Sequence, residues 1–300
     1  MDDYSALTFR SILHLTDFSG CSDAALTWAM SMARANGAKL SMLHVVIPDA
    51  LVYLTPGSPT DALDIQEEWA QKEMQRIEAQ LADLPHNTTV TRGTDVWSVV
   101  EPKLKQLESD LIVLGTHGRT GLSKILMGSV AERVLRSSAV PVMTVGPAVP
   151  RVRGGDGKFH RVLLATDFAA GSAEAAGYAI AFAQRDEAQL VLVHACKNNH
   201  NKSAKRSELS VAEVMHRLDA TIPCAESLRH RPETLVEYGE PGAQIVEVAK
   251  RKEADLIVMG IRTAGSLFAA THLKVGTAHN VVAQASCPVL TVRPKIREAA

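Results

Sequence analysis

The chain has no apolar run long enough to cross a bilayer, and aromatic residues make up only 4% of it. A membrane-spanning helix needs about 20 consecutive, predominantly apolar residues, so the sequence excludes that class of protein. The N-terminal stretch MDDYSALTFRSILHLTD begins with acidic residues and lacks the basic and apolar regions of a secretory signal. These absences predict a protein of the cytoplasm with no membrane partner.

Cysteine is scarce as well. The four cysteines, Cys21, Cys196, Cys224 and Cys287, are far apart in the sequence and form no C-x-x-C pair. A zinc site and a redox-active pair both need closely spaced cysteines, so neither is predicted. We expect reduced, partly buried thiols.

Neither sign of charge dominates the whole chain, whose net charge is −1. The first 150 residues carry −5 and the last 150 carry +4. The basic half has no stripe of basic residues interleaved with aromatic ones, so no nucleic-acid partner is predicted. Its densest basic segment, residues 197–206, is typical of a solvated loop. Opposite charges on the two halves are equally consistent with halves that pack together.

The sequence repeats itself. RSILHLTDFSGCSDAAL at 10–26 returns as HRVLLATDFAAGSAEAA at 160–176, DLIVLG at 110–115 as DLIVMG at 255–260, and VPVMTV at 140–145 as CPVLTV at 287–292. The offset between the copies drifts by a few residues, which indicates small insertions and deletions between two copies of one domain. The stretch between them, residues 146–158, is rich in glycine and proline and is typical of a linker. We therefore predict domains at residues 1–150 and 157–300.

Each copy alternates short β-branched runs with longer helical patterns. In the first copy the predicted strands are 10–16, 39–46, 88–93, 110–115 and 141–145, and the predicted helices are 22–36, 61–84, 95–109 and 129–137. The helix at 61–84 has apolar positions at Leu63, Trp69, Ile77 and Leu81, and Gly37 is placed to end the helix at 22–36. Strands that are apolar throughout and alternate with helices are typical of a parallel sheet covered on both faces. The prediction is an α/β fold with two tandem doubly wound domains, each with a five-stranded parallel sheet in the order 3-2-1-4-5.

A glycine-rich segment, GTHGRTGLSKILMGSVAERVL at 115–135, begins at the end of the fourth predicted strand. In a doubly wound sheet, ligands bind beyond the carboxyl ends of the strands, which is where this segment lies. The backbone at Gly115 and Gly118 can approach a ligand closely because these residues have no Cβ. Ser129-x-x-Glu132 has the spacing of a capping box, and the N-terminus of the helix that it opens is a natural phosphate site. The alternative is an ordinary strand-to-helix loop. The segment matches neither the P-loop nor the dinucleotide fingerprint.

The spacing Gly115-x2-Gly118-x9-Gly128-Ser129 resembles the nucleotide-binding signature of the universal stress protein family. The resemblance covers essentially the whole chain, as two such domains in tandem. It implies that ATP binds the first domain, with Mg²⁺ able to accompany the phosphates. By the same resemblance, Asp17 lies beside adenine and ribose, the Val45 backbone hydrogen-bonds adenine, and Gly115 and Gly118 admit the ribose and phosphates. The phosphate-binding residues it implies are Arg119, Gly128, Ser129 and Val130. For Asp17 the alternative is a turn-forming residue that caps the next helix.

The second copy departs from this pattern. Asp167 and Gly260 persist, but Thr263 stands where the second glycine is expected, and Gly276-Thr277 arrives three residues late. An apolar insert occupies residues 267–270, although Arg262 or Lys274 could still meet a phosphate. The second pocket could thus hold nucleotide, another ligand or nothing.

The sequence shows no catalytic constellation and no metal cluster, so no catalytic or metal-binding residue is predicted. His14, His44 and His194 fall inside predicted strands, and His117 in the glycine loop is expected chiefly to pack that loop. The favoured function is an adenine-nucleotide-binding regulatory module of the stress response that an unknown protein partner reads. The alternatives are a slow ATPase or phosphotransfer enzyme and a nucleotide-independent scaffold.

The last predicted strands of the two copies are short, apolar sheet edges, which invite a partner strand. In the resembled family these strands pair across a two-fold axis, so we expect the two domains to pair within one chain. The sequence is compatible with a homodimer of tandem chains but does not specify one.

Overall fold

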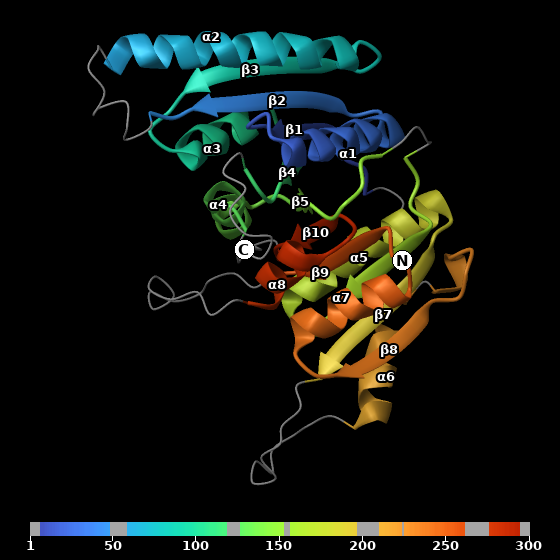
Figure 1. The fold of residues 1–300 in the computed structure, drawn as a ribbon. Coiled ribbons are helices and arrows are strands. Elements are labelled where there is room, and N and C mark those ends of the chain that lie inside the picture. Colours follow the sequence, from blue (N-terminus) through green and yellow to red (C-terminus); the bar gives the residue numbers. More distant parts are fainter. Residues whose placement is uncertain are drawn as a thin grey trace, which may run out of the picture. The chain divides into compact units, whose positions relative to one another are not determined.

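A computed structural model describes residues 7–48, 59–118, 127–152, 157–196, 210–223, 225–261 and 276–294 (Figure 1). The chain divides into two compact units, a first unit of Phe9–Pro147 with Arg151–Gly157 and a second unit made mainly of Lys158–Ala300. Within the described residues, no helix combines the length and the apolar character that crossing a membrane would require.

The first unit alternates strands and helices as the sequence predicts. Its elements are β1 (Ser11–Leu15), α1 (Gly20–Asn36), β2 (Lys39–Val46), α2 (Pro59–Glu78), η3 (Ala79–Leu81), β3 (His86–Arg92), α3 (Val96–Gln106), β4 (Leu111–Gly115), α4 (Ser129–Ser137) and β5 (Val142–Val145). The strands pair in parallel in the order β3-β2-β1-β4-β5. The predicted doubly wound order 3-2-1-4-5 is therefore confirmed.

The second unit repeats this order. Its elements are β6 (Arg161–Ala165), α5 (Ala170–Asp186), β7 (Gln189–Cys196), α6 (Val211–Ala220), η4 (Ala225–Ser227), β8 (Glu233–Tyr238), α7 (Pro241–Arg251), β9 (Leu256–Gly260), α8 (Thr277–Gln284) and β10 (Val289–Val292). The parallel pairings give the order β8-β7-β6-β9-β10. Each topological element of the first unit thus has a counterpart in the second.

Local signals fix the helix ends, and α1 ends at Gly37 as the sequence predicts, although it begins at Gly20, two residues before the predicted start. Ser19 caps α1 by accepting the N–H of Ser22, and Gly37 ends the helix in the left-handed region with φ of 62°. Asp95 caps α3 in the same way through the N–H of Ser98. Short polar side chains at helix starts and glycine at a helix end satisfy backbone groups that the helix leaves without partners.

Helix α2 buries a stripe that only partly matches the prediction. The deeply buried positions of this region are Ala70, Met74, Ile77 and Leu81. This spacing follows one face of a helix and includes Ile77 and Leu81, as predicted. Trp69 does not belong to it, because its position is beside the stripe and its side chain is 41% exposed.

Part of the segment after β5 packs along α1. The Arg151 guanidinium lies 3.2 Å from the Asp23 carboxylate, and the Val152 N–H donates to the Thr27 hydroxyl at 3.0 Å. Asp23 and Thr27 are one helical turn apart on the same face of α1. Residues 151 and 152, in the middle of the predicted linker, are therefore attached to the first unit.

Candidate functional site

A cavity of about 490 Å³ opens at the carboxyl ends of β1, β2 and β4 in the first unit. Its lining comes from these strand ends and from α2, α3 and the start of α4. The lining residues include Asp17, Val45, Gly115, Gly118, Gly128, Ser129 and Val130. Seven of the eight residues that the sequence singles out therefore meet at one cavity. The eighth, Arg119, lies outside the described residues.

The turn after β1 brings Asp17 to the cavity. Phe18 has a positive φ of 60°, and its N–H donates to the Thr16 hydroxyl at 3.0 Å. The Asp17 carboxylate accepts the N–H of Ser19 at 3.0 Å, which makes a tight Asx-type turn into α1. Asp17 therefore forms the turn, as the alternative prediction held, while Ser19 caps the helix. It also lines the cavity, so the two interpretations of this residue are compatible.

The end of β2 presents backbone polar groups to the cavity. The Leu43 carbonyl accepts the Thr16 N–H on the β1 side, and the Val46 carbonyl accepts the Gly93 N–H on the β3 side. Backbone directions alternate along a strand, so the N–H and C=O of Val45 point to the β1 side. Strand β1 has already ended there, since Leu15 is the last residue that pairs with β2, opposite Leu43. The Val45 backbone is thus available to a ligand edge.

The two glycines of the loop after β4 lie close to other parts of the protein. A Cβ at Gly115 would come within 2.9 Å of the backbone of Cys21 and Ser22, so this glycine allows α1 to pack closely on β4. A Cβ at Gly118 would lie 2.9 Å from the Asp17 carboxylate. Gly115 therefore has a packing role that the sequence does not reveal, besides its place in the cavity wall.

The prediction of a capping box formed by Ser129 and Glu132 at the start of α4 is wrong. Gly128 is the N-cap, Ser129 is the first helical residue, and no side chain caps the helix. The Gly128 N–H donates to the Thr116 carbonyl at 2.8 Å, which fixes the loop one residue before the predicted cap. Glu132 instead faces Arg136 at 3.8 Å. The first N–H groups of α4, at Ser129, Val130 and Ala131, consequently have neither an intrahelical acceptor nor a side-chain cap at the cavity wall.

Histidines near the cavity are held by local hydrogen bonds. His44 Nδ1 lies 2.8 Å from the Thr16 carbonyl oxygen, and His117 Nδ1 lies 2.8 Å from the Thr116 hydroxyl. His117 Nε2 is buried with no hydrogen-bond partner among the described residues, and His117 lines the cavity. In the part of the chain that the structure describes, no group of three or more His, Cys, Asp or Glu side chains is arranged to hold a metal ion.

Sequence reasoning missed the wall that α2 and α3 contribute. Gln66 and Trp69 from α2 and Val96 from α3 line the cavity, together with Ile47 after β2. Trp69 was predicted only as an apolar position of its helix. A large aromatic residue one position away from a regular buried stripe is the signal that could have identified it.

The second unit repeats the strand-end geometry. Phe168 has φ of 59°, its N–H donates to the Thr166 hydroxyl at 3.0 Å, and its ring stacks on His194 as Phe18 packs on His44. Gly276 is the N-cap of α8, again without a side-chain cap. The Ser172 hydroxyl donates to the Asp167 carboxylate at 2.7 Å, whereas in the first unit Ser22 donates to Thr16 instead. The departures at Thr263 and residues 267–270, and the candidate phosphate contacts Arg262 and Lys274, lie outside the described residues.

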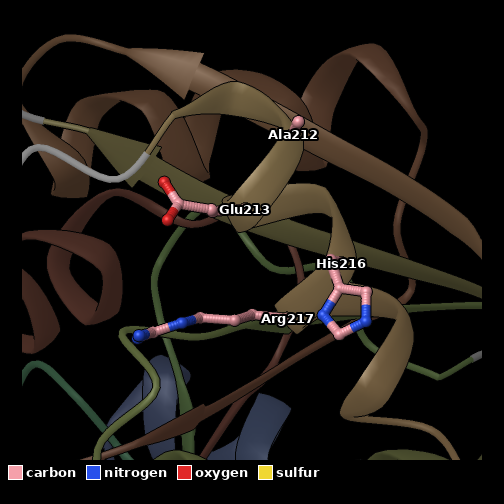
Figure 2. Close-up of a pocket in the computed structure, with 4 residues that line it drawn as sticks. All are labelled: Ala212, Glu213, His216 and Arg217. Atoms are coloured by element: carbon pink, nitrogen blue, oxygen red, sulfur yellow. The ribbon is translucent and has the colours of Figure 1, made fainter.

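Helix α6 of the second unit has a cavity of its own, about 300 Å³ in volume and lined by Ala212, Glu213, His216 and Arg217 (Figure 2). The Glu213 and Arg217 side chains extend from one side of the helix, and His216 points in another direction. The Arg217 guanidinium lies 5.7 Å from the centre of the Phe168 ring. In the first unit, the residue that contacts the equivalent phenylalanine from the equivalent helix is Trp69, 5.3 Å from Phe18 between ring centres.

Comparison with known proteins agrees with this architecture. The universal stress protein family model matches residues 8–146 and again 158–293. A universal stress protein of Mycolicibacterium smegmatis is 28% identical over 96% of this chain and 98% of its own length. The crystal structure of a universal stress protein from Archaeoglobus fulgidus has 25% identity and a TM-score of 0.68, covering 95% of this chain and 98% of its own. Another universal stress protein, solved in complex with cAMP, is 20% identical over 45% of this chain with a TM-score of 0.34. This chain therefore belongs to the universal stress protein family, with two family domains in tandem.

Proposed function

We propose that the first unit binds ATP and acts as a nucleotide-dependent regulatory module of the stress response. The observation that carries the proposal is the uncapped start of α4 at one end of a cavity whose other end presents the Val45 backbone. An N-terminus of a helix bears roughly half a positive charge and offers free N–H groups, which together suit a phosphate chain. A strand-end backbone offers one donor and one acceptor, which suit the edge of a base.

The size and polarity of the cavity support the same ligand class. Its volume of about 490 Å³ falls in the range of small-molecule sites. Leu43, Val46 and Ile47 make the end of β2 an apolar part of the lining, whereas Gly128 and Ser129 come from the start of α4. A molecule with a planar base at one end and phosphates at the other matches this distribution.

The test is a change that strengthens the helix cap while it removes the phosphate site. Gly128 has φ of −63° and ψ of 149°, a backbone that any residue can adopt. In Gly128→Asp, the carboxylate is expected to cap α4 by accepting the N–H groups intended for phosphate and to repel the phosphates by its charge. We expect a folded protein that binds Mg-ATP at least 100-fold more weakly than the wild type in calorimetric titration.

Two matched variants complete this experiment. Gly128→Ala adds only the Cβ, which would meet the Thr116 carbonyl oxygen at 3.3 Å, and it should weaken binding far less than Gly128→Asp. Gly276→Asp makes the same change at the corresponding cap of α8 and should leave the first site unaffected. Undiminished ATP affinity of a folded Gly128→Asp variant would refute the proposed site.

The regulatory role requires that ATP stay bound and intact long enough for a partner protein to recognise the ATP-bound form. Adenine nucleotide released by denaturing the purified protein is therefore expected to be ATP, at about one per chain for a single working site. Steady release of phosphate from Mg-ATP would instead favour the slow ATPase. The cytoplasmic setting and the pairing of the two domains through their last strands remain predictions from the sequence.

A further inference from the structure

Trp69 is a part of the cavity wall that the family signature does not contain. Its side chain lines the cavity and is 41% exposed. The indole meets the Phe18 ring edge to face, with 5.3 Å between ring centres and 90° between planes. Phe18 in turn packs on His44 at 4.6 Å. These aromatic contacts hold Trp69 in a fixed place at the cavity while leaving much of its surface accessible.

The position of Trp69 along the cavity is set by the sheet order. Helix α2 packs on β2 and β3, whereas α4 packs on β5, and β1 and β4 lie between β2 and β5. Trp69 is therefore on the side of the cavity where β2 ends at Val45 and Val46. The uncapped start of α4 is on the other side. A planar group that hydrogen-bonds the Val45 backbone would lie beside the indole, and phosphates would lie away from it.

The second unit provides a contrast at the same place. Arg217 of α6 approaches Phe168 where Trp69 of α2 approaches Phe18, and Glu213 extends beside it (Figure 2). The phenylalanine and the histidine are the same in both units, so in this set of ring contacts the residue from the second helix is the one that differs. An arginine with a glutamate on the same side of the helix does not offer the broad apolar face of an indole.

We propose that Trp69 is the specificity-determining residue of the first site, where its indole stacks against the base of the bound nucleotide and favours purines. This proposal rests on the proposed function of the site. Stacking of a base on an aromatic side chain changes affinity by roughly 5- to 150-fold when the side chain is replaced by alanine. A purine presents a larger ring system than a pyrimidine, so the contact favours ATP over UTP.

The experiment measures ATP and UTP affinities of the full-length protein by calorimetry in the presence of Mg²⁺. We expect the wild type to prefer ATP, and Trp69→Ala to lose about tenfold in ATP affinity but much less in UTP affinity. The ratio of the two affinities should therefore fall toward one. Trp69→Phe keeps an aromatic face and should restore most of the preference. Ile65→Ala, on the same helix and at a residue that is 67% exposed, should leave both affinities unchanged.

Fluorescence gives a readout that a purely structural role would not move. The chain has three tryptophans, Trp28, Trp69 and Trp97. Stacking predicts that ATP quenches the emission of the wild type and of Trp28→Phe, and that Trp69→Phe loses this quenching although it still binds ATP.

The outcomes separate this inference from the proposed function. If the wild type binds no nucleotide, both fail. If Gly128→Asp abolishes ATP binding but Trp69→Ala keeps both the affinity and the ATP-to-UTP ratio of the wild type, only the stacking proposal is overturned.

Discussion

A buried histidine in β1 makes the stability of the first unit depend on pH. His14 is fully buried, and its Nδ1 lies 3.1 Å from the Val113 carbonyl oxygen. A carbonyl can only accept a hydrogen bond, so Nδ1 carries the proton and Nε2 is the nitrogen left to titrate. Nε2 is buried with no hydrogen-bond partner among the described residues. Burial lowers the pKa of His14 from 6.5 to about 4, although the Val113 carbonyl and the charge of Asp17 partly oppose this effect.

The direction and size of the pH effect follow from that pKa. The unfolded chain binds the proton near pH 6.5 and the folded chain only near pH 4, so the unfolded state takes up the proton first as the pH falls. The stabilisation that His14 provides as a neutral residue is complete above pH 6.5 and is lost as the pH falls from 6.5 to 4. The two pKa values differ by an amount that corresponds to about 3 kcal/mol of unfolding free energy.

The second repeat supplies the substitution that tests this effect. The residue of β6 that corresponds to His14 is Leu164, which is also fully buried. We expect His14→Leu to fold. Its unfolding free energy minus that of the wild type should increase by ~3 kcal/mol when the pH is lowered from 7 to 4. Urea unfolding followed by circular dichroism at half-unit pH intervals measures this difference.

Carboxylates also titrate in this range, but they are common to both proteins and cancel in the comparison. His230→Gln, at an exposed histidine, controls for the loss of any imidazole and should follow the wild-type curve. Parallel stability curves for the wild type and His14→Leu would refute the assignment of the pH effect to His14.

Two further predictions concern packing in the cores. Burial raises the pKa of the Cys287 thiol to about 12, so alkylation at pH 8 should leave Cys287 unmodified in the native protein and modify it only after unfolding; modification at the rate of a free thiol would contradict its burial. A Cβ at Gly260 would come within 2.2 Å of the Gly171 backbone, closer than the 2.9 Å contact at Gly115, so Gly260→Ala should destabilise its unit by about 1–3 kcal/mol and by more than Gly115→Ala. Urea titrations of the two variants rank them, and equal losses would show that the second repeat relaxes more readily than its backbone contact suggests.

Much of the fold was predictable because it depends on patterns that recur. Apolar strands alternating with helices dictate a parallel sheet with covered faces. Because the sequence contains two copies of the domain, the same pattern predicts the fold of both. The location of the cavity was predictable from the sheet topology as well, since ligands in such sheets bind at the carboxyl ends of the strands. The seven predicted site residues that line the cavity were named from the family resemblance, and each lies at or near the end of a strand or at the start of α4.

The details that failed depend on contacts between distant segments. The capping box at Ser129 is correct in spacing, but the hydrogen bond from Gly128 to the Thr116 carbonyl starts the helix differently. The packing role of Gly115 depends on the backbone of α1, which approaches from about 90 residues earlier in the chain. Trp69 lines the cavity with its ring against Phe18, a contact that a helical pattern does not contain.

The repeat also shows which features are evidence for a ligand. The Thr-Asp-Phe turn, the histidine beneath the phenylalanine and the uncapped helix start occur in both units. Features common to both units belong to the repeated fold, so they do not distinguish the ligand of one unit from the ligand of the other. Two differences between the units can distinguish their ligands. Arg217 replaces Trp69 beside the phenylalanine, and Asp167 accepts a hydrogen bond from Ser172. A second site that binds a ligand is therefore expected to select it by charge at this corner, rather than by stacking.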